Sequence, residues 1–286
     1  MDNKNTPIKI TKMQGCGNDF VILDYEEFKK MDCEMSEVAK KLCNRNFGIG
    51  ADGLIIPNLN TDETDIGWFF YNSDGTTAQM CGNGMRCFAK YVYDKKLVSK
   101  NIFTVKTLAG TMTPEILENG QVKVNMSKPI LEPEKIPFLP NHNLNYKISV
   151  KDRIFEGNAV SMGNPHFVIF IKDDENLLEL AKKYGALIET SPEFPEKTNV
   201  EFIKIHSKTE IELCVWERGC GITLACGTGA CASVVAGILN GYLENIVDVQ
   251  LLGGKVKVSW NGNSKKTDED VFLTGPANYT FKAELL

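Results

Sequence analysis

Cys81-Gly82-Asn83-Gly84 returns 145 positions later as Cys226-Gly227-Thr228-Gly229, and this repetition is the strongest indication of how the chain folds. Two further signatures repeat in the same order, at offsets of 146 and 144 positions: Gly17-Asn18-Asp19-Phe20 as Gly163-Asn164-Pro165-His166, and Leu108-Ala109-Gly110 as Leu252-Gly253-Gly254. Self-similarity at a fixed offset is the sequence sign of repeated architecture. We therefore predict two similar halves.

Hydrophobic patterning around these stretches predicts the elements of each half. Short apolar runs next to turn residues predict buried strands at 20–23, 54–56, 68–71 and 167–171, and alternating runs predict half-buried strands at 122–124, 211–215 and 256–258. Met85, Phe88, Ala89 and Val92 have helical spacing, whereas residues 230–239 are apolar on every side, so a helix should follow each cysteine. The Pro-rich stretch 129–140 is interpreted as the linker between the halves.

Composition limits the classes of function. A chain of 286 residues with 43% hydrophobic content can bury a substantial core, and a net charge of −5 from 32 basic and 37 acidic residues offers no basic surface for nucleic acid. Residues 1–10 are polar, and no run approaches the roughly 20 apolar residues of a membrane span. We expect a cytoplasmic protein without membrane or nucleic-acid partners, whose nine cysteines are reduced.

The two Cys-Gly-x-Gly stretches are chemically suggestive because each precedes a predicted helix. A helix N-terminus carries unpaired N–H groups and partial positive charge, so it binds carboxylates and should lower the pKa of a thiol there. Glycines in the stretch allow a ligand to approach the backbone. A thiol of this kind in each half, facing a common cleft, would place a base and an acid on opposite sides of one α-carbon and so invert it.

Cysteines in such a sequence can also be structural residues, zinc ligands or redox pairs. A single cysteine before a helix is most often a small buried hydrophobe, but two at matched positions favour chemistry. Zinc is disfavoured because five residues separate Cys81 from Cys87, and likewise Cys214, Cys220 and Cys226 from one another. No Cys-x-x-Cys redox motif is present.

Over nearly its whole length the chain resembles the diaminopimelate epimerase family. The resemblance rests on motifs in a specific order: Gly17-Asn18-Asp19-Phe20, Gly48-Ile49-Gly50-Ala51-Asp52-Gly53, Asn72-Ser73-Asp74-Gly75, Met80-Cys81-Gly82-Asn83-Gly84-Met85-Arg86-Cys87, Gly163-Asn164-Pro165-His166, Asn199-Val200-Glu201-Phe202, Glu217-Arg218-Gly219 and Ala225-Cys226-Gly227-Thr228-Gly229-Ala230. It implies an α/β (α+β) fold of two pseudo-symmetric domains. Each would be a mostly antiparallel sheet wrapped around a central helix, with the active site in the cleft between them. We expect the domains at 1–126 plus 276–286 and at 127–275.

The resemblance also implies the roles of individual residues. Cys81 and Cys226 would be the acid/base pair that interconverts LL- and meso-diaminopimelate for lysine and peptidoglycan synthesis, without pyridoxal phosphate, metal or other cofactor. His166 and Glu217 would tune the thiols, although His166 is equally well explained as a core histidine. The small-molecule amino-acid substrate would be held by Asn18, Asn72, Gly82, Asn83, Asn164, Asn199, Glu217, Arg218, Gly227 and Thr228. A homodimer is a further expectation from the family.

Two alternative functions stay open at this point. A sister two-cysteine racemase would act on histidine, proline, hydroxyproline or a lanthionine-like substrate, and Gly53, where the family commonly has a glutamine, weakens the assignment to diaminopimelate. From another class, a fold-related non-racemase isomerase or a binding protein would keep the cleft without the chemistry. The presence of both cysteines argues against that second alternative.

Overall fold

The chain folds into two compact units in a computed structural model that describes residues 7–172 and 175–285. Unit 1 comprises the described residues up to Val124 and those from Gly275 onward, and unit 2 comprises 125–274. The predicted boundaries, after 126 and before 276, differ from these by two residues and one residue. Residues 1–6 of the polar segment 1–10 lie outside the described residues. No helix within the described ranges has both the length and the apolar character of a membrane span.

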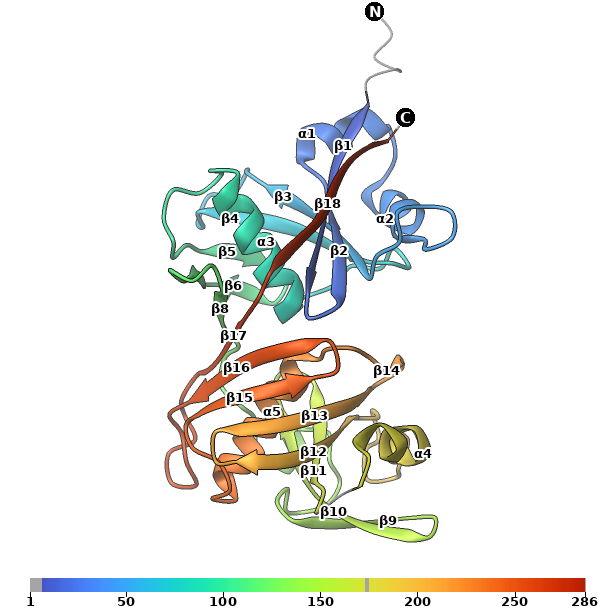
Figure 1. Ribbon diagram of the computed structural model, residues 1–286, viewed down its shortest axis with the longest axis vertical. Helices are drawn as coiled ribbons and strands as arrows, with labels where there is room; N and C mark the ends of the chain where they lie inside the picture. The colour runs from blue at the N-terminus through green and yellow to red at the C-terminus, as the bar shows by residue number, and fades with distance from the viewer. Residues whose placement is uncertain (1–6, 173–174, 286) are drawn as a thin grey trace, which may run out of the picture. The chain divides into compact units, whose positions relative to one another are not determined.

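Unit 1 alternates pairs of strands with helices. Its strands are β1 (Ile8–Gly15), β2 (Asn18–Ile22), β3 (Gly53–Asn58), β4 (Ile66–Asn72), β5 (Val105–Thr107), β6 (Gly110–Met112), β7 (Pro114–Ile116), β8 (Val122–Asn125) and β18 (Asn278–Leu285). Its helices are α1 (Tyr25–Phe28), the 3-10 turn η2 (Lys29–Met31), α2 (Met35–Cys43) and α3 (Gly82–Asp94). One sheet has the order β18-β1-β2-β3-β4-β5-β6, and Figure 1 shows the dark red β18 beside the blue β1.

Unit 2 has the same plan. Its strands are β9 (Tyr146–Val150), β10 (Arg153–Ser161), β11 (Pro165–Phe170), β12 (Asn199–Ser207), β13 (Glu210–Glu217), β14 (Gly221–Ile222), β15 (Ile246–Leu251), β16 (Gly254–Trp260) and β17 (Val271–Gly275). Its helices are the 3-10 turn η3 (Pro133–Lys135), α4 (Leu177–Glu189) and α5 (Gly227–Leu239). Among the strands of unit 2 the order is β17-β16-β15-β13-β12-β11-β10-β9, with β14 paired to β13.

Strand directions confirm the predicted duplication. In unit 1 the successive pairs from β1 to β6 are antiparallel, parallel, antiparallel, parallel and antiparallel. The series β10, β11, β12, β13, β15 and β16 repeats that sequence of directions. Each parallel pair is joined through a helical crossover, as parallel strands require. The predicted α/β class with mostly antiparallel sheets is therefore confirmed.

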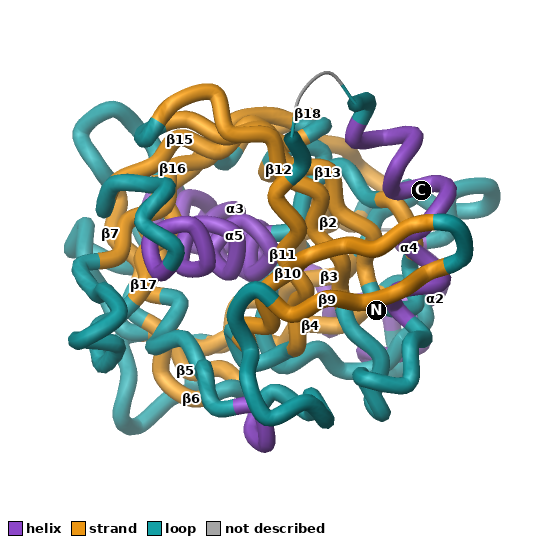
Figure 2. The backbone as a smooth tube through the Cα atoms, turned by 90° about the horizontal axis from the view of Figure 1, so that it is seen from below, coloured by secondary structure: helices purple, strands orange, loops and turns teal. Residues whose placement is uncertain are grey.

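The two helices after the cysteines lie as their sequences predict. In α3 the predicted apolar positions Met85, Phe88, Ala89 and Val92 are all fully buried, and the helix packs on β1, β2 and β3. In α5 every residue from 229 to 238 is buried. Figure 2 shows α5 surrounded by strands of its own unit, and it contacts β10, β11, β12 and β16. The predicted strands are also confirmed, in β2, β3, β4, β8, β11, β13 and β16, although the predictions at β2 and β11 each extend one residue past the end of the strand.

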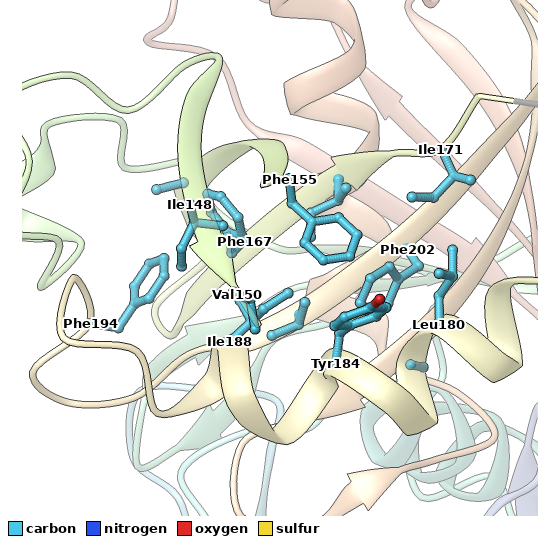
Figure 3. Packing of buried hydrophobic residues seen from close by; sticks show 14 of the residues in the cluster. Ile148, Val150, Phe155, Phe167, Ile171, Leu180, Tyr184, Ile188, Phe194 and Phe202 are labelled. Carbon is cyan, nitrogen blue, oxygen red and sulfur yellow. The ribbon is translucent and has the colours of Figure 1, made fainter. Parts of the chain in front are cut away.

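The linker prediction for 129–140 was wrong, because this stretch belongs to the core of unit 2. Ile136 and Phe138 are buried there, and the Phe138 ring stacks on Phe194 with 4.9 Å between centroids. The same core holds α4, whose Tyr184 and Ile188 face the sheet in Figure 3. The apolar residues between the prolines pack against their own unit and so cannot serve as a free connection.

Buried thiols should make the protein less stable at high pH. Burial raises the pKa of Cys43 and Cys87 to about 12 and that of Cys214 to about 11. Since the folded state then holds protons that the unfolded chain releases, stability is full below the unfolded pKa near 9. Each thiol should remove about 1.4 kcal/mol of unfolding free energy per pH unit from there up to its folded pKa.

Urea denaturation of the reduced protein at pH 8, 9 and 10 measures this slope. Cys214→Val should flatten it by one thiol's contribution, and Cys33→Val, at an exposed cysteine, is the matched control. An unfolding free energy that stays constant from pH 8 to pH 10 would contradict the prediction.

Candidate active site

The unit 1 thiol lies at the N-terminus of α3. Cys81 is the N-cap residue, with extended backbone angles, and its Sγ accepts a hydrogen bond from the Gly84 amide at 3.5 Å. The thiol also donates to Asn18 Oδ1 at 3.5 Å, and Asn83 Nδ2 donates to the same oxygen at 3.1 Å. Three predicted site residues, Asn18, Cys81 and Asn83, are thus brought together, and Gly82 is the first residue of α3.

A tight hairpin turn positions Asn18. Gly15 and Asn18 are paired across β1 and β2, leaving Cys16 and Gly17 as the two turn residues. Both have positive φ, 54° and 85°, which is the backbone of a type I′ turn and matches the twist of the flanking strands. Asn18 consequently begins β2 beside the first turn of α3.

A charged network fixes the Asn18 amide. Its Nδ2 donates to Asp52 Oδ2 at 2.6 Å, and Arg45 bridges Asp52 and Asp19 at 2.8 and 2.9 Å. Burial raises the pKa of the Asp19 carboxyl, but hydrogen bonds and charge from Arg45 and Lys12 outweigh it and the net shift is downward. With its Nδ2 held by Asp52, the Asn18 amide directs its oxygen toward Cys81. Asp52 was not among the predicted site residues, although it belongs to the Gly48–Gly53 motif.

Asn72 has a different setting from the other unit 1 residues. It ends β4 on the surface, and its Nδ2 donates to Thr76 Oγ1 at 3.0 Å, so this hydrogen bond stabilises its own turn. In the sheet it pairs with Gly53. The structure therefore gives Asn72 a turn-stabilising contact, and its predicted contact with substrate stays a prediction.

Packing explains why position 53 is a glycine. A Cβ atom there would lie 2.7 Å from the Tyr71 carbonyl oxygen and 2.8 Å from Phe70 Cε2, closer than real Cβ contacts. We expect Gly53→Ala and Gly53→Gln each to lower the unfolding free energy in urea by about 1–3 kcal/mol, because overpacking forces neighbours to shift. A Gly53→Ala protein as stable as the parent would contradict this.

The unit 2 thiol occupies the equivalent place on α5. Cys226 is the N-cap residue, is 6% exposed, and its Sγ accepts from the Gly229 amide at 3.3 Å. Thr228 Oγ1 lies 3.4 Å from the same sulfur, and Asn164 Nδ2 donates to that hydroxyl at 3.4 Å. The structure thus brings Asn164, Cys226 and Thr228 together, and Gly227 is the first residue of α5.

Behind this thiol lies a buried acid that sequence reasoning missed. Glu201 on β12 and His166 on β11 have fully buried side chains, with 2.7 Å between Glu201 Oε1 and His166 Nδ1. His166 Nε2 lies 3.0 Å from Asn164 Oδ1. His166 is therefore both a hydrogen-bonded core histidine and a neighbour of the Cys226 site. The available signal was an acidic residue in the apolar strand Val200-Glu201-Phe202.

A third group of predicted residues gathers where β13 ends. Asn199 Oδ1 accepts from the Arg218 backbone amide at 2.9 Å, and Asn199 Nδ2 donates to the Pro165 carbonyl at 2.8 Å. Glu217 accepts a hydrogen bond from the Thr223 hydroxyl. The exposed Arg218 side chain is held by one bond, from Nη1 to the Glu196 carbonyl at 3.1 Å. Backbone and side-chain contacts together fix this loop.

The prediction of a lowered thiol pKa was wrong for Cys226. Burial, and then the negative charges of Glu217 and Glu201, raise the pKa of Cys226 well above its ordinary value. Hydrogen bonds from Thr228 and Gly229 act in the opposite direction but are outweighed. The upward effect of desolvation and the two carboxylates on this pKa thus exceeds the downward effect expected from the helix N-terminus. Cys226 is therefore a protonated thiol at neutral pH.

Within residues 7–172 and 175–285, no group of three or more His, Cys, Asp or Glu side chains is arranged to hold a metal ion. The functional groups at the two sites are thiols, backbone amides, side-chain amides, a hydroxyl, an imidazole, two carboxylates and one exposed guanidinium. These groups transfer protons and bind carboxylates and ammonium groups.

Comparison with known proteins gives one consistent result. A family model described as diaminopimelate epimerase matches residues 10–132 and 158–280, one segment for each repeat. A diaminopimelate epimerase of Desulfitobacterium hafniense is 47% identical over 288 residues, covering 98% of both chains. That of Carboxydothermus hydrogenoformans is also 47% identical, covering 97% of this chain and 99% of the relative, and that of Methanococcus maripaludis is 43% identical with the same coverage.

Solved structures share the fold at much lower identity. A Bacillus anthracis phenazine biosynthesis protein of the PhzF family matches with a TM-score of 0.72 at 16% identity, covering 98% of this chain and 99% of that chain. A hydroxyproline epimerase from Agrobacterium vitis matches with a TM-score of 0.69 at 10% identity, covering 98% and 93%. At these identities the likeness concerns the fold alone.

Proposed function

This chain belongs to the diaminopimelate epimerase family, and we propose that it interconverts LL- and meso-diaminopimelate by passing one α-proton between two thiols. One observation carries the proposal: Cys81 and Cys226 are the N-cap residues of equivalent helices in duplicated units. Because a single base tends to return a proton to the face it left, inversion needs a second group on the opposite face. The proposal therefore places one substrate α-carbon between the two sulfurs.

Proton transfer in this scheme is balanced. In the starting state Cys81 is the thiolate and Cys226 the thiol, an order favoured by the carboxylates near Cys226. Cys81 takes the α-proton, the bonding electrons stay on the α-carbon, and Cys226 donates its proton to the other face. The product leaves a Cys81 thiol and a Cys226 thiolate, so the reverse reaction begins from that state.

Backbone amides are the proposed means of lowering the barrier. The α-proton is weakly acidic beside a carboxylate, so negative charge developing there must be stabilised by oriented dipoles. The amides of Gly82, Asn83, Gly227 and Thr228 belong to the first residues of α3 and α5, where helices leave N–H groups unpaired. We assign the reacting carboxylate to these amides.

The remaining polar residues are assigned to the distal end of the substrate. Diaminopimelate carries a second ammonium and a second carboxylate, which need acceptors and donors in a fixed arrangement. Side-chain oxygens and the Arg218 guanidinium provide these groups: Asn18, Asn72, Asn164, Asn199, Glu217 and Arg218. In this assignment His166 acts on the Cys226 site through Asn164, to which it is hydrogen-bonded.

An incubation in deuterium oxide tests the proposed function. The reduced protein is mixed separately with LL-diaminopimelate, meso-diaminopimelate, L-histidine and L-proline, and stereochemistry and α-deuteration are followed by NMR. We expect inversion with deuterium incorporation for diaminopimelate alone. Inversion of histidine or proline alone would overturn the substrate assignment, and no exchange with any of the four would overturn the proposal.

A further inference from the structure

The duplicated units differ at two matched positions below the thiols. Phe20 on β2 pairs with Gly53 on β3, and His166 on β11 pairs with Asn199 on β12, each residue 146 positions after its counterpart. Two residues farther along β3 and β12 the same offset matches Ile55 with Glu201. Unit 1 thus has an apolar pair, Phe20 and Ile55, where unit 2 has His166 and Glu201.

These pairs lie under the first turns of α3 and α5. A Cβ atom on Gly84 would lie 3.4 Å from the Phe20 ring, whereas one on the equivalent Gly229 would lie 2.7 Å from Glu201 Oε1 and 3.2 Å from Cys226 Sγ. Since both atoms are that close to one point, the oxygen and the sulfur lie within the roughly 6 Å over which a negative charge disfavours a thiolate.

A chain of contacts also leads from Glu201 to the sulfur. An ionised carboxylate only accepts, so His166 Nδ1 donates to Glu201, and the Asn164 amide oxygen also only accepts, so His166 Nε2 donates to Asn164. Asn164 in turn donates to Thr228, whose hydroxyl contacts Cys226. The carboxylate thereby orients the His166 ring against Asn164. Asn164 in turn contacts the Thr228 hydroxyl that lies beside the Cys226 thiol.

The charge of Glu201 is not required by the fold. Its Oε2 is buried without a hydrogen-bond partner among the described residues, and an unpaired buried oxygen of this kind is destabilising by about 1–3 kcal/mol or more. At the matched position Ile55 fills the same place in unit 1 with no polar atom and is fully buried. A buried carboxylate therefore destabilises unit 2, while unit 1 folds with an isoleucine at the matched position. We attribute the presence of Glu201 to a role in the reaction and not to the fold.

We propose that Glu201 is a positioning residue: together with His166 it makes the second thiol site chemically unlike the first, so that Cys226 begins the reaction as the proton donor. This inference rests on the proposed function for its reaction but not for its test. The charged and titratable groups around Cys226 are Glu201 on β12, Glu217 at the end of β13, and His166 on β11. Burial and these two carboxylates raise the pKa of Cys226, which agrees with the assignment.

The test measures the pH dependence of alkylation at each thiol in the absence of substrate, by iodoacetamide labelling and peptide mass spectrometry. In Glu201→Gln we expect the midpoint for Cys226 to move down by about one pH unit, because a neighbouring negative charge is lost. The midpoint for Cys81 should stay in place. In turnover, kcat should fall about tenfold with KM nearly unchanged. This is less than the roughly 10²–10⁴-fold expected for removing a general acid, because the Cys226 thiol is still present in the variant.

Two further variants keep the test decisive. His166→Phe/Glu201→Ile carries the unit 1 pair into unit 2, and it should fold and show the same downward shift even if Glu201→Gln does not fold. Ile55→Val, at the matched position, should leave both midpoints unchanged. Unshifted Cys226 midpoints in the Glu201 variants would overturn the inference. A shifted midpoint in a protein that inverts no amino acid would instead overturn only the proposed function.

Discussion

Replacing either Cys81 or Cys226 with alanine is expected to lower kcat for diaminopimelate inversion by at least about 10³-fold. Each variant lacks either the base or the acid of the two-base scheme, and a positioned acid or base contributes about 10²–10⁴-fold to a rate. The thiol that remains can still exchange the α-proton on its own face. In deuterium oxide we therefore expect Cys226→Ala to deuterate, without inverting, the epimer whose α-hydrogen faces Cys81, and Cys81→Ala to favour the other epimer.

A matched control separates this effect from general thiol loss. Cys33 is exposed and lies between η2 and α2, away from both helix N-termini, so Cys33→Ala should keep the parent rate. The measurements are chiral analysis of the product and α-proton loss by NMR, made with reductant present. If either alanine variant at 81 or 226 inverted the substrate at more than a tenth of the parent rate, a two-thiol mechanism would be excluded.

The sequence predicts the thiol sites well because their determinants are local. A cysteine followed by Gly-x-Gly and then by apolar residues at helical spacing produces an N-cap and a buried helix in either unit, regardless of the rest of the chain. The nearly constant offset between the repeats also shows which residues of the two thiol sites correspond to each other. Asn18 and Asn164 follow from the same offset, since each begins or precedes a strand next to its helix.

Features set by tertiary packing were not predictable in this way. Glu201 stands out in the sequence as an acidic residue between apolar ones, but its complete burial and its position near Cys226 depend on the packing of α5 on β12. The pKa of Cys226 moved opposite to the helix-dipole expectation because desolvation depends on that same packing. The linker prediction failed for the same reason, because Ile136 and Phe138 are apolar residues that pack in the hydrophobic core of unit 2.

The missed helix α4 shows a different kind of failure, in which the signal was present. Asn176 caps it by accepting from the Leu178 and Glu179 amides at 2.9 and 3.2 Å. Leu180, Tyr184 and Ile188 then recur at four-residue spacing on its buried face. An N-cap residue followed by that spacing is a helix signature, so α4 was within reach of the sequence.

Arg218→Met is expected to lower kcat/KM for diaminopimelate by about 10²-fold, mainly through KM. Hydrogen bonds to charged groups contribute about 1.5–3 kcal/mol, and each 1.4 kcal/mol is tenfold in affinity. The Arg218 side chain is exposed and its Nη1 is held by the Glu196 carbonyl at 3.1 Å, so the guanidinium has further donors for a carboxylate. Arg218→Lys should recover only part of the loss, because an ammonium lacks the planar fork of donors.

L-Lysine distinguishes substrate binding by Arg218 from support of its loop. Lysine is diaminopimelate without one carboxylate, so it lacks the group assigned to Arg218 while keeping the reacting end and the distal ammonium. If the assignment is right, Arg218→Met weakens diaminopimelate binding but leaves inhibition by lysine unchanged, because the Arg218 backbone amide keeps its 2.9 Å bond to Asn199. An equal loss for both ligands would mean that the side chain maintains the loop carrying Glu217, and the distal carboxylate would then need another partner.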